Sequence, residues 1–433
     1  MAVPANADIL VIGGGPAGSS AAALLARRGY DVVLVDKVRH PRETVGESVL
    51  PSAWKYFDLL GVTRAVEHEG FVKKAGGVVA WGDEITQISF RDFAYGRPGL
   101  HVERAALDYL LLNNAKAAGA QILEGLRAES FITDDAGNSE VALSTGNGDR
   151  AQRVRCRFLI DATGQASFTA RQFGTKQLDT DFRFVALWGY FTGSRYVSSD
   201  GIIREFEDIP DHSPMTFVSH LGGWGWAWHI PMRKETSVGI VVSVDDYKKH
   251  VGSHASLEQY FLSTCRGIEH LSRLLAPARL TSSGVRIMRD YSYAPDRIAG
   301  PGYFVIGDAA GFVDPIFSIG VVMALYSGQL AAWAIDRSLQ RPVRAPAYRK
   351  LFENQMRGRY ELARTMALPV SDGAGDAPDG AKMYFDFFSK SEQELMWSAA
   401  SMTTRSGNLV RTASDGSAPV VLKRRQLDAL RFA

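Results

Sequence analysis

ADILVIGGGPAGSSAAALLARRGYDVVLVDK, residues 7–37, is the stretch that decides the fold of this chain. An apolar run, Ile9–Ile12, leads into the glycine-rich turn 13–18, and an alanine- and leucine-rich helix follows. A second apolar run, Val32–Val35, ends at Asp36. The pattern predicts a strand, a tight turn, a helix and a second strand that is closed by an acid.

Each conspicuous residue of this stretch has a physical task in binding a dinucleotide. Gly13 permits the tight turn, Gly15 allows the backbone to approach a pyrophosphate, and Gly18 lets the helix pack closely on its strand. The unpaired N–H groups at the start of the helix attract phosphate. Asp36 follows at the distance where an acid accepts hydrogen bonds from a ribose. The chain is therefore predicted to bind a dinucleotide.

Length and composition limit the class of protein. The chain has 433 residues, 46% of them hydrophobic, which is enough for two or three domains around a buried cofactor. The formal net charge is only +2 and the basic residues are scattered, so nucleic acid is not an expected partner. The two cysteines, Cys156 and Cys265, indicate neither a disulfide framework nor a metal site. Without a signal sequence or a membrane-length apolar run, we expect a cytoplasmic protein that does not bind membranes.

The chain is expected to return to the nucleotide-binding domain twice. RFLIDATG, residues 157–164, and GYFVIGD, residues 302–308, each read as a buried strand that ends at an acid. Between them, alternating aromatic and β-branched residues indicate an antiparallel sheet. We predict an FAD-binding domain from residues 1–70, 99–165 and 288–345, a β-rich substrate domain from 71–98 and 166–287, and a helical C-terminal segment over 346–433. The fold class is α/β (α+β overall), a Rossmann-like domain with an inserted β-sheet domain.

Three motifs together resemble the FAD monooxygenase superfamily that includes p-hydroxybenzoate hydroxylase. GGGPAG with Asp36 is similar to its ADP-binding motif, DATG at 161–164 to its second nucleotide motif, and GDAAG at 307–311 to its third. The resemblance implies FAD as the cofactor. The residues that it implies in FAD binding are Gly13, Gly15, Pro16, Ala17, Gly18, Asp36, Lys37, Arg104, Asp161, Gly307, Asp308, Pro315 and Gly320.

Four further segments resemble the flavin-dependent halogenases, especially those that act on pyrroles or phenols. They are GESVLP at 46–51, GFVKKAGG at 70–77, WAWHIP at 226–231 and DPIFSIG at 314–320. The resemblance implies that reduced FAD (FADH2) and O2 form a C4a-hydroperoxide, which oxidises chloride or bromide to hypohalous acid. It also implies a separate flavin reductase, so that the enzyme is one half of a two-component oxidoreductase.

The resemblance places chemistry on particular residues. Lys74 would orient or capture the oxidant, although Lys73 is the alternative if the register differs by one residue. Glu47 would serve as an acid or base. The halide would lie at the backbone N–H groups of Ser318, Ile319 and Gly320, because such turns favour anions. Many halogenases have Ser or Thr where this chain has Ile319.

Two other activities stay open at this stage. A flavoprotein monooxygenase of this fold would hydroxylate an aromatic ring directly, including a peptidyl tryptophan during quinone-cofactor maturation. A geranylgeranyl-reductase-like enzyme would saturate double bonds. For the halogenase we expect a pyrrole, phenol or indole substrate, either free, carrier-tethered or peptidyl. Free tryptophan is disfavoured, since Phe317 stands where tryptophan halogenases have a glutamate.

Overall fold

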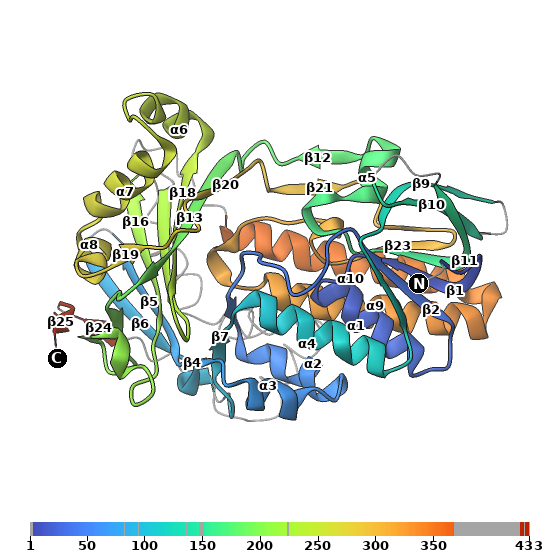
Figure 1. The fold of residues 1–433 in the computed structure, drawn as a ribbon, viewed down its shortest axis with the longest axis horizontal. Helices are drawn as coiled ribbons and strands as arrows, with labels where there is room; N and C mark the ends of the chain where they lie inside the picture. The colour runs from blue at the N-terminus through green and yellow to red at the C-terminus, as the bar shows by residue number, and fades with distance from the viewer. Residues whose placement is uncertain are drawn as a thin grey trace, which may run out of the picture.

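Two large sheets, each with its own helical layer, dominate the described part of the molecule (Figure 1). The structure is a computed structural model, and it describes residues 3–81, 83–93, 95–134, 137–146, 151–222, 225–367, 425–427 and 429–432. One sheet carries the nucleotide-binding turn, and the other forms a roof that faces it across a cavity.

The first sheet has eight strands around a parallel core. Its strands, in spatial order, are β22 (Ala299–Gly300), β23 (Tyr303–Val305), β11 (Gln152–Asp161), β1 (Asn6–Ile12), β2 (Val32–Asp36) and β8 (Gln121–Glu124). Strand β10 (Ser139–Ser144) pairs antiparallel with β11, and β9 (Arg127–Thr133) pairs antiparallel with β10. The pairs of β1 with β11 and β2, and of β11 with β23, are parallel. The predicted return at 157–164 therefore lies beside the first strand, and the return at 302–308 lies beside the first return. The predicted fold class is confirmed.

Four helices stack beside this sheet (Figure 1). They are α1 (Pro16–Ala26), α4 (Arg104–Ala117), α9 (Gly320–Gln340) and α10 (Ala345–Ala367). Helix α1 packs between α4 and α9, and small side chains make this possible. A Cβ atom on Gly328 of α9 would lie only 2.3 Å from the Ser20 hydroxyl of α1. The glycine-rich turn and the start of α9 are thereby held near each other.

The second sheet, which we call the roof sheet, has nine strands. They are β19 (Arg279–Leu280), β13 (Phe184–Thr192), β18 (Thr236–Ser243), β17 (Gly225–Pro231), β16 (Thr216–Gly222), β5 (Gly76–Trp81), β6 (Glu84–Ser89), β24 (Arg425–Leu427) and β20 (Arg286–Arg289), which pairs with β13. Alternation along β13 divides its side chains. Val185 and Leu187 pack under helices α6 (Val244–Val251), α7 (Leu257–Gly267) and α8 (Glu269–Leu275), whereas Ala186 and Trp188 face the cavity.

A three-stranded sheet joins the two halves. It consists of β3 (Ser48–Val49), β7 (Gly99–His101) and β4 (Val72–Lys74), with β7 in the middle. The remaining regular elements are α2 (Trp54–Leu59), α3 (Thr63–Glu69), α5 (Phe168–Phe173), β12 (Lys176–Leu178), β21 (Tyr293–Pro295), β14 (Tyr196–Val197), β15 (Ile202–Arg204), β25 (Arg431–Phe432), and short 3-10 turns at 51–53, 90–93, 164–166, 206–208, 307–310, 315–317 and 342–344.

The predicted helical segment over 346–433 is wrong at its end. Helix α10 occupies its beginning, but β24 pairs antiparallel with β6 and β25 pairs parallel with β15. Strand β6 would otherwise be the edge of the roof sheet, and later residues of the chain pair with it as an added strand. The helical spacing of apolar residues near Tyr348 gives no sign of this strand. Residues 368–424 lie outside the described part of the chain. The other predicted domain limits stay predictions.

Candidate functional site

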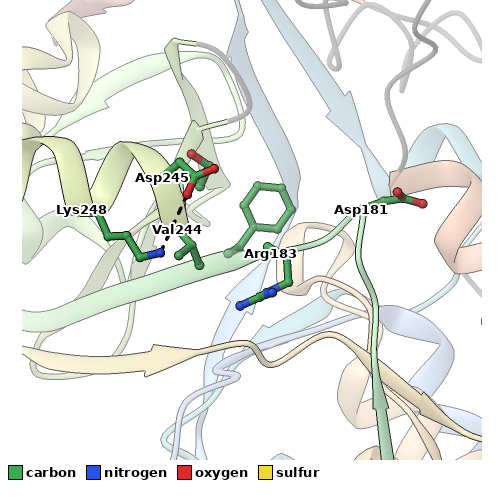
Figure 2. Close-up of a pocket in the computed structure, with 7 residues that line it drawn as sticks. Asp181, Arg183, Val244, Asp245 and Lys248 are labelled. Atoms are coloured by element: carbon green, nitrogen blue, oxygen red, sulfur yellow. Dashed lines mark ion pairs between the residues drawn. The ribbon is translucent and has the colours of Figure 1, made fainter.

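A cavity of about 940 Å³ lies between the two sheets. Most of the predicted site residues line it: Gly13, Gly15, Pro16, Ala17, Asp36, Lys37, Glu47, Arg104, Gly307, Asp308, Pro315, Ser318 and Gly320. Gly18, Lys74, Asp161 and Ile319 are close to it but do not line it. A second, open hollow of about 260 Å³ lies beside α6 (Figure 2). Its charged side chains are exposed, and Lys248 and Asp245 pair with each other at 4.0 Å, so the larger cavity is the candidate site.

The glycine-rich turn forms one end of the cavity. Gly13 has φ +109°, and a Cβ atom there would lie 2.2 Å from the Ala162 carbonyl oxygen, so only glycine fits. Gly18 is as restricted, since its Cβ would lie 1.9 Å from the Gly13 carbonyl oxygen. Helix α1 begins at Pro16 without a side-chain cap among the described residues. Its first N–H groups are free to bind an anion, which is what a pyrophosphate needs.

Asp36 is held in place at the end of β2. Its Oδ2 accepts a hydrogen bond from the Gly14 N–H at 2.7 Å, and its Oδ1 accepts one from the Val38 N–H at 2.8 Å. Each carboxylate oxygen keeps a further lone pair. The side chain lines the cavity, so those lone pairs are available to ribose hydroxyl groups.

Two arginines lie near the start of α1, and sequence reasoning found only one. Arg104 donates from Nε and Nη2 to the two Asp108 oxygens at 2.9 and 3.0 Å, and from Nη1 to the Val45 carbonyl at 2.8 Å. Arg42 lies with Nη2 3.7 Å from Asp108 Oδ2, and a Cβ on Gly15 would be 3.4 Å from that nitrogen. Arg42 belongs to a loop without periodicity, so no sequence signal singled it out. Both guanidinium groups line the cavity beside the expected position of the phosphates.

The two acids of the later motifs have different roles. Asp161 is fully buried, and it accepts hydrogen bonds from the Thr163 N–H and hydroxyl and from the Thr169 N–H. It therefore shapes the turn after β11 and does not line the cavity, and its contact with FAD stays a prediction. Asp308 does line the cavity. Burial raises its pKa to about 6, while the Arg104 guanidinium opposes that rise.

The loop before α9 is the predicted place of the halide. Asp314 accepts hydrogen bonds from the Ile316 N–H at 3.0 Å and the Tyr291 hydroxyl at 3.2 Å, and burial raises its pKa to about 7. The turn then passes through Ser318, at φ +57°, to the start of α9. The side chain of Ile319 is buried in the hydrophobic core, so it does not narrow the cavity. Ser318 and Gly320 line the cavity, and the first N–H groups of α9 carry no side-chain cap among the described residues.

Lys74 is a buried cation next to the cavity. In β4 its side chain is 4% exposed whereas Lys73 points outward, so the register favours Lys74. Lys74 Nζ donates to the Ser48 hydroxyl at 2.8 Å and lies 5.3 Å from the centre of the Phe90 ring. Burial lowers the pKa of Lys74 to about 7. Ser48 lines the cavity, so one hydroxyl group separates the ammonium from it.

Glu47, the residue directly before Ser48 in the sequence, is a buried acid. Its Oε1 accepts a hydrogen bond from the Tyr190 hydroxyl and its Oε2 accepts one from the Gly46 N–H, each at 2.8 Å. Burial raises the pKa of Glu47, and these two hydrogen bonds oppose the rise. The carboxyl group lines the cavity and is well placed to hold a proton there.

The roof sheet lines its part of the cavity without charge. Its lining residues are Ala186, Trp188, Thr216, Val218, Trp226, Trp228, Ile230 and Met288. The rings of Trp226 and Trp228 lie 5.6 Å apart, and Trp228 donates from Nε1 to the Ser237 hydroxyl at 3.1 Å. Trp228 lies directly over Gly239, where a Cβ atom would be 2.2 Å from the ring. The WAWHIP strand therefore contributes both core packing and an aromatic cavity wall.

These features define a dinucleotide-binding protein whose site fits FAD: glycine-only positions beside a free helix start, an acid at the end of β2, and a long apolar extension. The family model described as "FAD binding domain" matches residues 6–341, and the chain belongs to that family. It also belongs to the flavin-dependent halogenases. It is 32% identical over 362 residues to a tryptophan 2-halogenase of Chondromyces crocatus, which covers 83% of this chain and 67% of that protein.

Further relatives agree. A flavin-dependent halogenase of Armillaria mellea, armH3, is 33% identical over 360 residues, with 78% of this chain and 69% of that protein covered. The chain thus spans about two thirds of the length of these curated relatives. Among solved structures, the myxobacterial chondrochloren halogenase CndH is 28% identical with a TM-score of 0.75, covering 96% of this chain and 92% of that chain. The brominase Bmp2, 22% identical with a TM-score of 0.76, covers 95% and 98% and shares the fold.

Membership of this family sets the cofactors and the reaction class. Flavin-dependent halogenases use FADH2, O2 and a halide, and the chain is an FAD-dependent oxidoreductase of this kind. The comparisons thus favour the halogenase interpretation over the reductase and hydroxylase alternatives. Within the described residues, no helix is long and apolar enough to cross a membrane, and no three His, Cys, Asp or Glu side chains gather as a metal site.

Proposed function

We propose that this chain halogenates an electron-rich, uncharged aromatic group, a phenol, pyrrole or indole, with Lys74 as the residue that directs the oxidant. The observation that carries the proposal is the placement of Lys74. Its ammonium is buried, it pairs with no carboxylate among the described residues, and a single hydroxyl group separates it from the cavity. A buried cation without a counter-ion is costly, so a function is the natural reason to keep it.

The residues divide the work as follows. Bound reduced FAD supplies, with O2, the oxidising equivalent that turns a halide into hypohalous acid. The N–H groups of Ile319 and Gly320 hold the halide at the start of α9, since the third predicted donor, the Ser318 N–H, already donates to the Pro315 carbonyl oxygen at 3.0 Å. Lys74 donates a hydrogen bond to the oxygen of hypohalous acid while the halogen bonds to the ring carbon and the O–halogen bond breaks to release hydroxide. Glu47 accepts the proton that the ring loses and returns it to the hydroxide, which leaves as water.

The substrate class follows from the roof sheet. Its cavity-lining side chains are aromatic or aliphatic apart from one threonine, and none is charged. A free amino acid would need partners for its ammonium and carboxylate groups, because burying either unpaired costs several kcal/mol. We therefore favour a neutral ring, free or presented by a carrier protein or peptide. The tryptophan 2-halogenase relative supports an indole as one such ring.

A separate flavin reductase is the partner that we propose. The chain has one dinucleotide fingerprint, at 13–18, and that fingerprint belongs to the FAD site. Reducing equivalents would then arrive with FADH2 that another protein has produced.

Mass spectrometry of turnover products tests the proposal. The full chain is incubated with FAD, a flavin reductase, NADH, O2 and bromide or chloride, and it is offered phenol, pyrrole, indole and tryptophan in turn. We expect halogen in a neutral ring, lost in Lys74→Ala and retained in the exposed neighbour variant Lys73→Ala. A product that gains oxygen without halogen would make the chain a hydroxylase. Faster halogenation of tryptophan than of indole would refute the neutral substrate class.

A further inference from the structure

A hydrogen-bonded network of buried polar side chains extends from Lys74 to residues on three other strands. Lys74 Nζ lies 2.8 Å from Ser48 Oγ, and Ser48 Oγ lies 3.3 Å from Thr216 Oγ1. Thr216 Oγ1 lies 2.8 Å from His101 Nε2, and His101 Nδ1 lies 2.9 Å from the Pro231 carbonyl oxygen. All four side chains are buried, from 0% to 6% exposed. This network links residues on β4, β3, β16 and β7, and it ends at a backbone carbonyl on β17.

The Pro231 carbonyl fixes the direction of every hydrogen bond in this network. A carbonyl oxygen only accepts, so His101 carries its proton on Nδ1 and donates to Pro231. The neutral ring then offers Nε2 as an acceptor, to which the Thr216 hydroxyl donates. Thr216 in turn accepts from Ser48, whose oxygen accepts from Lys74. The lone pairs of Ser48 are thereby turned toward the ammonium.

The ammonium proton of Lys74 stays on Lys74 and is not transferred through the hydrogen-bond network to His101. Burial and the nearby charge of Lys74 hold the pKa of His101 well below its usual value, whereas the pKa of Lys74 is about 7. The histidine is thus the poorer base of the two. The network orients and polarises the Lys74 ammonium group, and it does not accept a proton from it.

Among the described residues, the elements around Lys74 provide no stronger hydrogen-bond partner for its ammonium group. From β7 comes neutral His101, and from β17 comes His229, whose pKa burial lowers to about 3. The Glu47 carboxylate, beside β3, is held by Tyr190 and Gly46. From the turn at 90–93 comes the Phe90 ring, while Arg91 is exposed. The Ser48 oxygen is therefore the polar partner that decides how well the ammonium is stabilised.

We propose that Thr216 and His101 are positioning residues which act through Ser48 to hold the Lys74 ammonium in its charged form and in one orientation. The functional part of this inference rests on the proposed role of Lys74 in halogenation. Its physical part, the coupling of Lys74 to Thr216, stands by itself.

Removing the Thr216 hydroxyl tests the coupling. Thr216→Val keeps the shape, but it frees the Ser48 hydroxyl to turn its proton toward Lys74. We expect the pKa of Lys74 to fall by about one unit, the equivalent of one hydrogen bond. Thr216→Ser restores the hydroxyl and should restore the pKa. Thr236→Val is the matched control, because the Thr236 hydroxyl is buried in the same sheet without a hydrogen-bond partner among the described residues.

The readout is the titration of Lys74 by NMR of protein that contains [ε-13C]lysine, with the signal assigned from its loss in Lys74→Met. FAD affinity shows that each variant retains its fold. An unchanged titration in Thr216→Val, or an equal shift in Thr236→Val, would overturn the inference. If the titration shifts as expected but the wild type incorporates no halogen, the coupling stands and the proposed function fails. If halogenation occurs, its pH profile should move with the titration.

Discussion

Replacing Lys74 by Met should make the protein more stable while it abolishes halogenation. The native state holds a buried ammonium without a carboxylate partner among the described residues, and burial lowers its pKa from 10.5 to about 7. That shift corresponds to about 5 kcal/mol of destabilisation when both folded and unfolded states are charged. Methionine has a similar length and removes this cost, but it leaves the Ser48 oxygen unpaired, a loss of about 1 kcal/mol. The net gain below pH 7 is roughly 4 kcal/mol.

The pH dependence gives this prediction its sharpest test. Because the folded-state pKa of Lys74 lies below the unfolded-state value, only the unfolded state keeps the proton between about pH 7 and 10.5. The stability of the wild type relative to Lys74→Met should therefore rise with pH across that window, by up to about 1.4 kcal/mol per pH unit. Below pH 7 the difference is constant and at its largest.

Urea unfolding of the FAD-free protein at a series of pH values measures both quantities. Lys73→Met is the control, since the Lys73 side chain is exposed, and it should change the free energy of unfolding by less than about 0.5 kcal/mol. If Lys74→Met is less stable than the wild type, or if their stability difference does not vary with pH, Lys74 is not the uncompensated buried cation described here.

Three further outcomes follow from the cavity. Gly13→Ala should abolish FAD binding in a fluorescence titration, because its Cβ would lie 2.2 Å from the Ala162 carbonyl oxygen; Gly267→Ala, where a Cβ meets nothing within 4 Å, should bind FAD normally. Arg42→Ala should weaken FAD binding about tenfold, the loss of one partly buried charge-assisted hydrogen bond, and an unchanged dissociation constant would place the pyrophosphate elsewhere. Ile319→Ser should leave the KM for bromide within about twofold and lower the thermal midpoint, since this side chain packs in the core; a large fall in KM would mean that the side chain faces the halide.

The structure could be predicted best from the sequence where it is determined by residues that are neighbours in the sequence. The strand, turn and helix of residues 7–37 and the acid at 36 form as predicted, because glycine conformation, strand hydrophobicity and helix starts are properties of neighbouring residues. The returns at 157–164 and 302–308 were predictable for the same reason. Their place in one parallel sheet with β1, in the order β23, β11, β1, follows from the parallel arrangement that such units require.

Features that depend on distant residues were not predictable in this way. Arg42 lies near the start of α1 but belongs to an irregular loop. Asp161 accepts hydrogen bonds within the turn that follows its own strand. The partners of Lys74 come from strands 26, 27 and 142 residues away in the sequence, at Ser48, His101 and Thr216. No periodicity links such positions, so only the folded arrangement of five strands reveals them.

The pairing of β24 with β6 also has a consequence for how the chain is made. Residues 425–427 complete a sheet whose neighbouring strands lie near residues 76–89, so the ribosome must synthesise more than three hundred further residues before that edge is closed. Until then β6 exposes its backbone groups, and a nascent chain in this state is open to pairing with another copy. Expression yield should therefore depend on residues 425–427 far more than their distance from the FAD site suggests. Substitutions that weaken this strand act on the solubility of the whole protein.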